Sequence, residues 1–176
     1  IGRGRSFFVS DSYNKNERSI DEIVSAMSSL SRQKIGALVV IEREVGLNDI
    51  IESGTNLSAE ISSELLINIF IPNTPLHDGA VIIRDDLIEA AACYLPLTTN
   101  NTLSKELGTR HRAAIGISEK SDCLVVVVSE ETGTISIVSN GVINRYFDDE
   151  SLKDRLMKEL RDDENKLNFK RRIENE

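Results

Sequence analysis

Residues 35–41, with the sequence IGALVVI, lie between the charged residues Lys34 and Glu42. A short apolar run rich in β-branched side chains is typical of a buried strand. A second run of this kind, CLVVVV, occupies residues 123–128. The sequence therefore predicts a sheet with at least two strands that are shielded from water.

The segment before residues 35–41 has the pattern of an amphipathic helix. Ser19 is followed three residues later by Glu22, a capping-box signature that marks a helix start. The apolar residues around it recur at helical spacing. These residues are Ile20, Ile23, Val24, Met27 and Leu30. We therefore expect a helix to open the fold near Ser19.

The remaining segments alternate between helix and strand patterns. Two prolines end the helix predicted for residues 62–70, and the dipeptide Asp85-Asp86 indicates a tight hairpin turn. Residues 113–118 fit a helix or a strand, and we favour a helix that begins near Thr109. The other expected elements are a short helix at 47–52, strands at 79–84, 87–95, 123–128 and 134–138, and a last helix at 150–160.

These elements predict an α/β protein, with a mixed β-sheet flanked by helices on both faces in a single globular domain. A chain of 176 residues, 40% of them hydrophobic, is the size of one domain and buries a sizeable core. We place the domain at residues 1–160 and expect residues 161–176 to form a charged C-terminal tail with little to bury.

Composition excludes several classes of partner and setting. A net charge of −8 argues against binding nucleic acid through its phosphates. Cys93 and Cys123 lie in apolar runs, which suits reduced thiols in a cytosolic protein. No apolar stretch is long enough to span a bilayer, so we expect the chain by itself to be soluble. The basic start at residues 1–5 fits the cytoplasmic flank of a membrane segment or an arbitrary boundary equally well.

Two short polar clusters in apolar surroundings hold both histidines of the chain. The first, at residues 77–80, reads HDGA, and the second, at residues 108–112, reads GTRHR. An imidazole beside a carboxylate suits a metal ion, and paired arginines beside a Gly-Thr turn suit phosphate. A helix that begins near Thr109 would also point free N–H groups at an anion. Together the clusters predict a site for a metal ion and a nucleotide.

These residues resemble the catalytic domain of diadenylate cyclases, which join two ATP molecules into cyclic di-AMP and release pyrophosphate. The resemblance covers roughly residues 5–160. It rests on the order and spacing of the Asp-Gly-Ala triplet at 78–80, the cluster at 108–112 and the Ser-Glu-Glu element at 129–131. The residue before the triplet, the stretch at 93–97 and the basic start are most similar to the membrane-anchored branch. That likeness implies transmembrane helices before residue 1, with this chain as the cytoplasmic domain.

The resemblance implies roles for the first cluster. Asp78 would hold a divalent ion and orient or deprotonate the ribose 3′-hydroxyl, which is a weak nucleophile until its proton is drawn away. Gly79 would let the backbone close on the ligand next to Ala80. His77 would contribute a neutral imidazole to the ion. The alternatives are a turn-forming aspartate and a histidine on a surface loop.

The second cluster would hold the triphosphate. Arg110, with Thr109 and Gly108, would stabilise the negative charge that moves onto the departing pyrophosphate. His111 and Arg112 would either contact ATP or brace the loop or a dimer contact, because on a helix they point away from Arg110.

Two further segments gain a role only from the resemblance. Ser129 and Glu130 would bind ATP and Glu131 the metal, although from sequence alone a solvated hairpin turn explains them. Tyr94 and Leu95 would form the adenine pocket, with an aromatic face for stacking. Without the resemblance we would assign both to the core.

The implied reaction is symmetric, with the 3′-oxygen of each ATP attacking the α-phosphorus of the other. One domain holds one ATP, so the resemblance implies a head-to-head homodimer, formed at least transiently, with Mn²⁺ or Mg²⁺ as cofactor. It also implies a membrane regulator and a cell-wall sugar-phosphate mutase as partners. The competing interpretations are a non-catalytic nucleotide sensor and a metal-dependent nucleotide phosphohydrolase.

Overall fold

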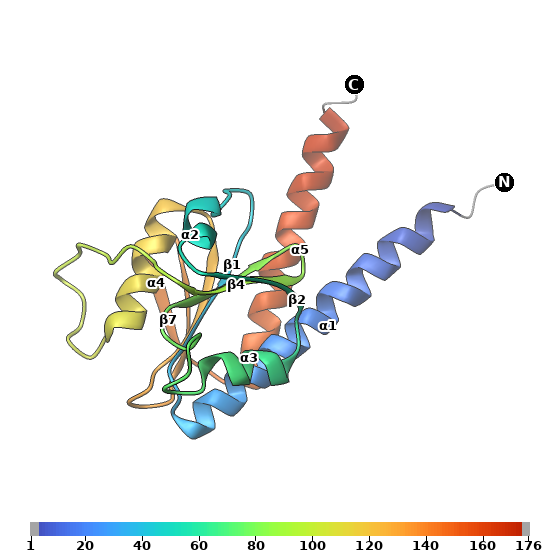
Figure 1. Ribbon diagram of the computed structural model, residues 1–176. Coiled ribbons are helices and arrows are strands. Elements are labelled where there is room, and N and C mark those ends of the chain that lie inside the picture. The colour runs from blue at the N-terminus through green and yellow to red at the C-terminus, as the bar shows by residue number, and fades with distance from the viewer. Residues whose placement is uncertain (1–3, 174–176) are drawn as a thin grey trace.

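The computed structural model describes the backbone of residues 4–173 and the side chains of residues 15–163 and 173. This part of the chain forms one seven-stranded sheet with helices against both faces (Figure 1), as the sequence predicts. Residues 1–3 of the basic start and residues 174–176 of the predicted tail lie outside the described residues.

Helices and strands alternate along much of the chain. The helices are α1 (Gly4–Gln33), α2 (Asn48–Glu52), α3 (Ser63–Phe70), α4 (Thr109–Lys120) and α5 (Asp149–Ile173). The strands are β1 (Ala37–Ile41), β2 (Thr55–Glu60), β3 (Ala80–Arg84), β4 (Leu87–Cys93), β5 (Leu124–Val128), β6 (Ile135–Ser139) and β7 (Val142–Phe147).

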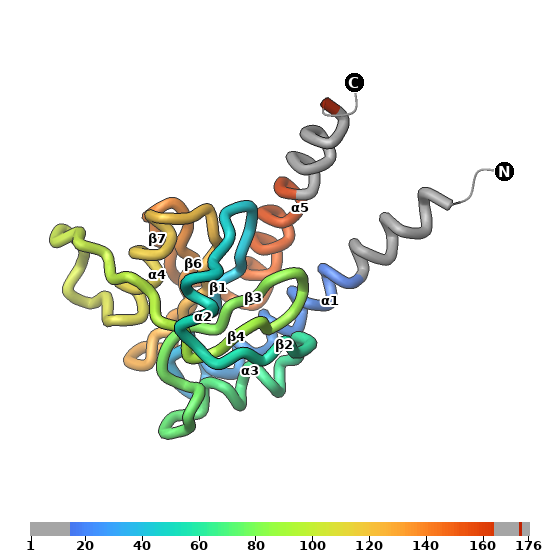
Figure 2. Tube along the Cα trace, turned by 45° about the horizontal axis from the view of Figure 1, so that its top comes forward, coloured from blue at the N-terminus to red at the C-terminus, as the bar shows by residue number. Residues whose placement is uncertain are grey.

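The first predicted strand lies at the centre of the sheet. The strand order is β2-β4-β3-β1-β5-β6-β7. Figure 2 shows β3 beside β4 in the chain trace. β1 runs parallel to β3, with Val39 opposite Val81, and antiparallel to β5, with Val39 opposite Val126. The other neighbouring pairs are antiparallel. The sheet is therefore mixed, as expected.

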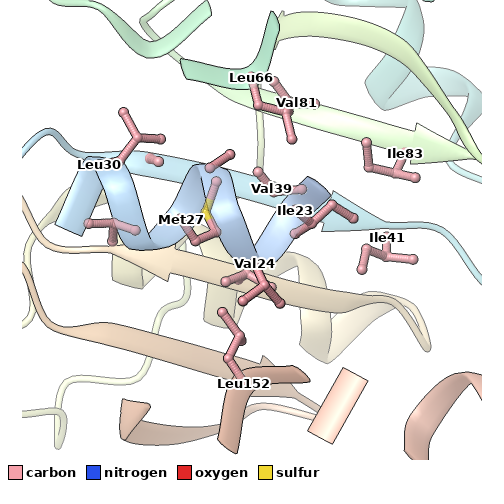
Figure 3. Packing of buried hydrophobic residues seen from close by; sticks show 14 of the residues in the cluster. Ile23, Val24, Met27, Leu30, Val39, Ile41, Leu66, Val81, Ile83 and Leu152 are labelled. Carbon is pink, nitrogen blue, oxygen red and sulfur yellow. The ribbon is translucent and has the colours of Figure 1, made fainter. Parts of the chain in front are cut away.

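Alternate residues of β1 face two separate cores, because successive side chains of a strand point to opposite faces. Val39 and Ile41 pack in a core shared with α1, α3 and α5, where Leu152 of α5 is fully buried (Figure 3). Leu38 and Val40 pack in a second core under α2 and α4. The apolar run in residues 35–41 thus covers both faces of the sheet.

The first helix begins earlier than predicted. Ser19 and Glu22 lie inside α1, so the predicted start near Ser19 is wrong. A capping box needs N–H groups that lack a helical partner, and inside a continuous helix those groups are already bonded. The carboxylate of Glu22 instead accepts a hydrogen bond from the backbone N–H of Ser63, at 2.6 Å, and so serves the start of α3.

The sequence did not predict β2 or β7, which are the two edge strands. Neither contains a continuous apolar run, since β2 reads TNLSAE and β7 reads VINRYF. Exposed and half-buried positions alternate along β7. An edge strand pairs on one side only, so it needs less apolar surface than a central strand.

The last helix extends past the predicted end at residue 160. Arg43, just after β1, pairs with Glu159 at 3.4 Å and also with Asp163. These ion pairs join α5 to the sheet at the point where the tail was expected to begin. The charged residues from 161 onward therefore continue a helix as far as Ile173.

Other local predictions are confirmed. The hairpin turn has positive φ at both Asp85 (49°) and Asp86 (60°), as a two-residue type I′ turn requires. Ser62 caps α3, and α4 begins at Thr109. Both cysteines are free and buried. Within the described residues, no helix combines the length and apolar character needed to cross a bilayer.

We predict that Leu152→Ala lowers the free energy of unfolding by about 2–5 kcal/mol, because it leaves a cavity between α5 and the sheet. Leu152 is 0% exposed, whereas Leu97 is 55% exposed. The matched substitution Leu97→Ala should therefore cost less than about 1 kcal/mol. Urea unfolding of the two variants measures the difference, and equal losses would show that α5 is not part of the folded core.

Candidate active site

Four strand ends meet at one edge of the sheet, which we call the site edge. β1 and β3 are parallel, so Gly36 and Gly79, which precede them, lie at the same edge. β5 is antiparallel to β1 and β4 to β3, so Ser129 and Tyr94, which follow them, lie there too. The topology thus brings together segments that are distant in sequence.

The first cluster enters β3 through a tight backbone approach. Gly79 has φ of +117°, and a Cβ atom there would lie 2.8 Å from the carbonyl oxygen of Cys93 in β4. Only glycine fits both the dihedral angle and the space. Ala80 is buried, whereas Asp78 is exposed at the site edge. The close packing of β3 on β4 therefore fixes the position of the backbone at Asp78, directly before the strand.

His77 has one ring nitrogen engaged by the backbone. Its Nδ1 lies 2.6 Å from the carbonyl oxygen of Thr74, which can only accept a hydrogen bond. In the neutral ring the proton is therefore on Nδ1, and Nε2 carries the lone pair. This is the tautomer in which an imidazole binds a metal ion through Nε2.

The second cluster forms the start of α4. Gly108 is the N-cap and makes no side-chain hydrogen bond to the first turn, which contains no acidic residue. Gly108 and Thr109 are both exposed. No side chain caps the N–H groups of the first turn, and a helix start of this kind attracts anions.

Arg110 reaches from this turn to the start of β1. Its guanidinium rests against Gly36, where an added Cβ would lie 2.6 Å from the Cζ atom of Arg110. Its Nη1 donates to Oε2 of Glu130 at 2.8 Å. Sequence reasoning did not single out Gly36, although a glycine directly before an apolar strand was a visible sign of close packing.

The segment after β5 is a turn held by its own hydrogen bonds. Ser129 Oγ accepts from the N–H groups of Glu131 and Thr132, both at 3.3 Å. The turn is joined to α1, because the Ser31 hydroxyl donates to the carbonyl oxygen of Gly133 at 2.6 Å. Ser129 is half-buried, and Glu130 and Glu131 are exposed.

A pocket at the site edge collects most of the predicted phosphate-binding residues. Its lining includes residues 108–111 and 129–131, together with Glu106 and Val128, which the sequence analysis did not select. His77, Asp78, Tyr94 and Leu95 do not line it.

His111 and Arg112 differ from Arg110 in their surroundings. His111 is only 3% exposed, and burial, followed by the charges of Arg145 and Arg110, lowers its pKa. It is therefore neutral near pH 7. Arg112 is half-buried, and its carbonyl oxygen accepts from the N–H of Thr98 at 3.1 Å. His111 thus packs beneath the turn and also lines the pocket, whereas Arg112 is tied through its backbone to Thr98.

Tyr94 is 79% exposed, so its assignment to the core on sequence grounds is wrong. Its backbone N–H donates to the Ser53 hydroxyl at 2.9 Å, which fixes the chain where it leaves β4. Leu95 is half-buried and packs against the second core. The ring of Tyr94 is therefore open to stacking at the site edge.

The predicted metal ligands do not form one cluster. Among the residues that the structure describes, no three His, Cys, Asp or Glu side chains lie close enough to hold a metal ion. Glu131 therefore does not join His77 and Asp78 in a ligand set within one chain. An ion at His77 and Asp78 needs further oxygen ligands, and the phosphates of a nucleotide are suitable donors.

We predict that His111 makes stability depend on pH below about 6.5, the ordinary pKa of histidine. Because its pKa in the folded protein is lower, the unfolded chain binds the proton first as pH falls. The stabilisation is complete above about pH 6.5 and is lost as pH decreases towards the folded pKa. Urea unfolding at about pH 7.5 and about pH 5.5 should show a larger loss for the natural protein than for His111→Gln. Equal losses would contradict the lowered pKa.

Comparison with known proteins places this site in a family. Residues 24–143 match the DAC family model, described as DisA bacterial checkpoint controller nucleotide-binding. The chain is 52% identical to the cyclic di-AMP synthase CdaA of Bacillus subtilis over 163 residues, which are 92% of this chain and 60% of that protein. It is 51% identical to a diadenylate cyclase of Listeria monocytogenes over 162 residues, 91% of this chain and 59% of that protein.

Solved structures agree with the fold. DacA from Staphylococcus aureus, crystallised as a double mutant, superposes with a TM-score of 0.79 at 50% identity, covering 81% of this chain and 95% of that one. A hypothetical membrane spanning protein from Bacillus cereus gives a TM-score of 0.69 at 50% identity, covering 72% and 62%. The chain spans about 60% of the length of the Bacillus subtilis CdaA and of the Listeria monocytogenes diadenylate cyclase. By its sequence match and its fold, the chain belongs to the DAC family.

Proposed function

We propose that this chain is the catalytic part of a diadenylate cyclase, which converts two ATP into cyclic di-AMP and two pyrophosphates. The observation that carries the proposal is the placement of Arg110. Its guanidinium lies at the uncapped start of α4, packs on Gly36 and holds the carboxylate of Glu130. A group that holds one anionic oxygen in this position is suited to hold those of a triphosphate.

The order of the strand ends gives a direction for ATP along the site edge. Tyr94 follows β4, Asp78 precedes β3, Gly36 precedes β1 and Ser129 follows β5, in the order of the sheet. Four adjacent strands span about 14 Å. In the proposed pose, adenine stacks near Tyr94, the ribose lies near Asp78, and the phosphates reach Arg110 and Ser129.

The chain's own residues then have separate tasks in the reaction. Asp78 takes the proton of the ribose 3′-hydroxyl while the 3′-oxygen forms a bond to the α-phosphorus of the other ATP. The bond between that phosphorus and the bridging oxygen of the β-phosphate breaks, and pyrophosphate leaves with the electron pair. Arg110 and the first-turn N–H groups of α4 stabilise the charge that develops there.

The chemistry requires two copies of the chain. One site edge provides one Asp78 and one Arg110, whereas the ring closes only when each 3′-oxygen attacks the opposite nucleotide. We therefore propose a head-to-head homodimer, at least transient. The exposed positions of Asp78 and Tyr94 suit a site that is completed by a partner.

A divalent ion, Mn²⁺ or Mg²⁺, fits the residues at this edge. The tautomer of His77 leaves Nε2 free to bind a metal, and the carboxylate of Asp78 follows it directly. Glu130 and Glu131 would repel a bound triphosphate unless a cation offset the charge. When bound, the ion supplies electrostatic stabilisation of the phosphate oxygens.

The relatives suggest that the natural protein is attached to a membrane, and which partners it has. Since this chain matches only part of their length, and one similar structure is named as a membrane spanning protein, we propose that further segments attach the natural protein to a membrane. A membrane regulator and a sugar-phosphate mutase are the partners that membership of this family suggests.

The proposal is tested by incubating the protein with ATP and Mn²⁺ or Mg²⁺ and identifying the products by mass spectrometry. Asp78→Asn should lower the rate of cyclic di-AMP formation by about 10²-fold or more, because the proton acceptor is lost. The matched control is Asp85→Asn, at the opposite end of β3, which should leave the rate unchanged.

Two other outcomes of this incubation would overturn the proposal. ATP binding without turnover would identify a nucleotide sensor, and ADP or AMP would identify a phosphohydrolase.

For a site shared by two chains, the rate per chain should rise with protein concentration until the dimer is saturated. A rate per chain that is constant over the whole dilution series, while dilution dissociates the dimer, would contradict the shared site.

We predict that Gly36→Ala weakens ATP binding by about tenfold or more, because the added methyl group displaces the guanidinium of Arg110 and a charge-assisted hydrogen bond is lost. Gly46→Ala is the control, since no atom beyond its two neighbours in the chain lies within 4 Å of a Cβ placed there. Calorimetric titration with ATP measures both. Unchanged affinity for Gly36→Ala would remove Arg110 from the binding site.

A further inference from the structure

Three buried polar atoms have no hydrogen-bond partner among the residues that the structure describes. They are Nε2 of His111, Oγ of Ser136 and Nε of Arg145. His111 is 3% exposed and Ser136 is fully buried. Buried polar groups without partners are costly and infrequent, so their joint occurrence calls for an explanation.

The three atoms occupy one layer of the molecule. Ser136 of β6 and Arg145 of β7 are opposite each other in the strand register. Ile135 and Ile137 face the core of α1 and α5, so the alternation of β6 turns Ser136 to the other face, towards α4. His111 lies in the first turn of α4 and is buried on that face. Strand register and burial therefore place His111 and Ser136 on the face of the sheet under α4, with Arg145 beside Ser136 on β7.

Their chemistry is complementary. Nε of Arg145 can only donate a hydrogen bond, and Nε2 of a neutral histidine with its proton on Nδ1 can only accept one. The Ser136 hydroxyl does both. Burial first, and then the charge of Arg145, lowers the pKa of His111 and keeps its ring neutral.

The other end of Arg145 reaches the phosphate pocket. Its Nη1 lies 3.4 Å from Oε2 of Glu106, two residues before the N-cap Gly108. Glu106 lines the same pocket as Arg110 and Ser129. Arg145 thus pairs with the loop before α4, while its buried Nε, like Nε2 of His111, has no partner among the described residues.

We propose that Arg145, acting with Ser136 and His111, is a positioning residue that holds the first turn of α4 so that Arg110 and its neighbouring N–H groups meet the triphosphate. This inference rests on the proposed function, because it assigns the phosphate site to that turn. Arg145 does not need to contact the nucleotide. Its planar guanidinium presents Nη1 to Glu106 and leaves the buried Nε for a second acceptor, a role that Nε2 of His111 can fill.

The test measures the affinity for α,β-methylene ATP, in which the bond that breaks in the reaction is replaced by a stable one. Arg145→Met and His111→Leu should each weaken binding by about tenfold, because the turn is no longer held. If the two residues act as one unit, the double variant should be weaker than either single variant by no more than about threefold. If the two losses of affinity multiply, so that the double variant binds about 100-fold more weakly than the natural protein, the proposal is overturned.

A second comparison separates position from charge. Arg145→Lys keeps the positive charge but loses the planar group and the Nε donor, so it should bind as weakly as Arg145→Met. Binding equal to that of the natural protein would mean that only the charge matters and would overturn the proposal. Arg155→Met is the matched control, since Arg155 is a half-buried arginine paired with Glu159 on α5. The affinity of this variant for the analogue should equal that of the natural protein.

Ser136→Ala removes only one hydroxyl and provides a variant that folds if Arg145→Met does not. It should weaken analogue binding by about threefold or more, and unchanged binding would count against the cluster. The chain contains only two histidines, so imidazole signals in NMR spectra fall into two sets. Ser136→Ala should shift the set of His111 and leave that of His77 in place.

Binding of the analogue does not depend on turnover. If the natural protein binds it with the expected variant pattern but forms no cyclic di-AMP, the proposed function fails and the positioning role stands. If cyclic di-AMP forms but the Arg145 variants bind normally, the positioning role fails alone. No binding of the analogue to the natural protein would overturn both.

Discussion

The position of β1 is the constraint on which the rest of the structure depends. β1 is paired with β3 on one side and β5 on the other, and both of its faces are covered by apolar cores. Each of its neighbours carries a polar segment at one end, and the parallel and antiparallel pairings turn those ends to the same edge. The site is thus a consequence of strand direction, and no long excursion of the chain is needed to assemble it.

At that edge, the absence of a side chain matters as much as the side chains present. Gly36 leaves the space in which the guanidinium of Arg110 lies, and Gly79 allows the backbone before β3 to approach β4. The ion pair of Arg110 with Glu130 holds the guanidinium in an orientation suited to anions. Glu130 is 65% exposed, so exchanging this carboxylate for a phosphate oxygen costs little.

The sequence predicted those parts of the fold whose signals are local. Residues 35–41 and 123–128 are apolar on both faces, which identifies central strands, and Asp85-Asp86 identifies the hairpin. The edge strands β2 and β7 were missed, because one-sided pairing leaves them polar. Glu22 misled the helix prediction, since its carboxylate serves a helix that begins about forty residues later.

The same division applies to the site. Residues 77–80 and 108–112 are recognisable because histidine, aspartate and arginine stand together in apolar surroundings. Tyr94 and Ser129 gained a role only from a family resemblance. Gly36 and Arg145 were missed because their importance comes from contacts with residues far away in the sequence, and no spacing pattern encodes such contacts.

The hydrogen bond between Ser31 and Gly133 has a mechanical consequence. Ser31 lies in the last turn of α1, a helix of 30 residues, and Gly133 closes the turn that carries Ser129 and Glu131. A loop fixed to a helix at one point is less free to move than a loop held only by its own hydrogen bonds. The wall of the pocket formed by this turn therefore takes its position from α1 as well as from β5.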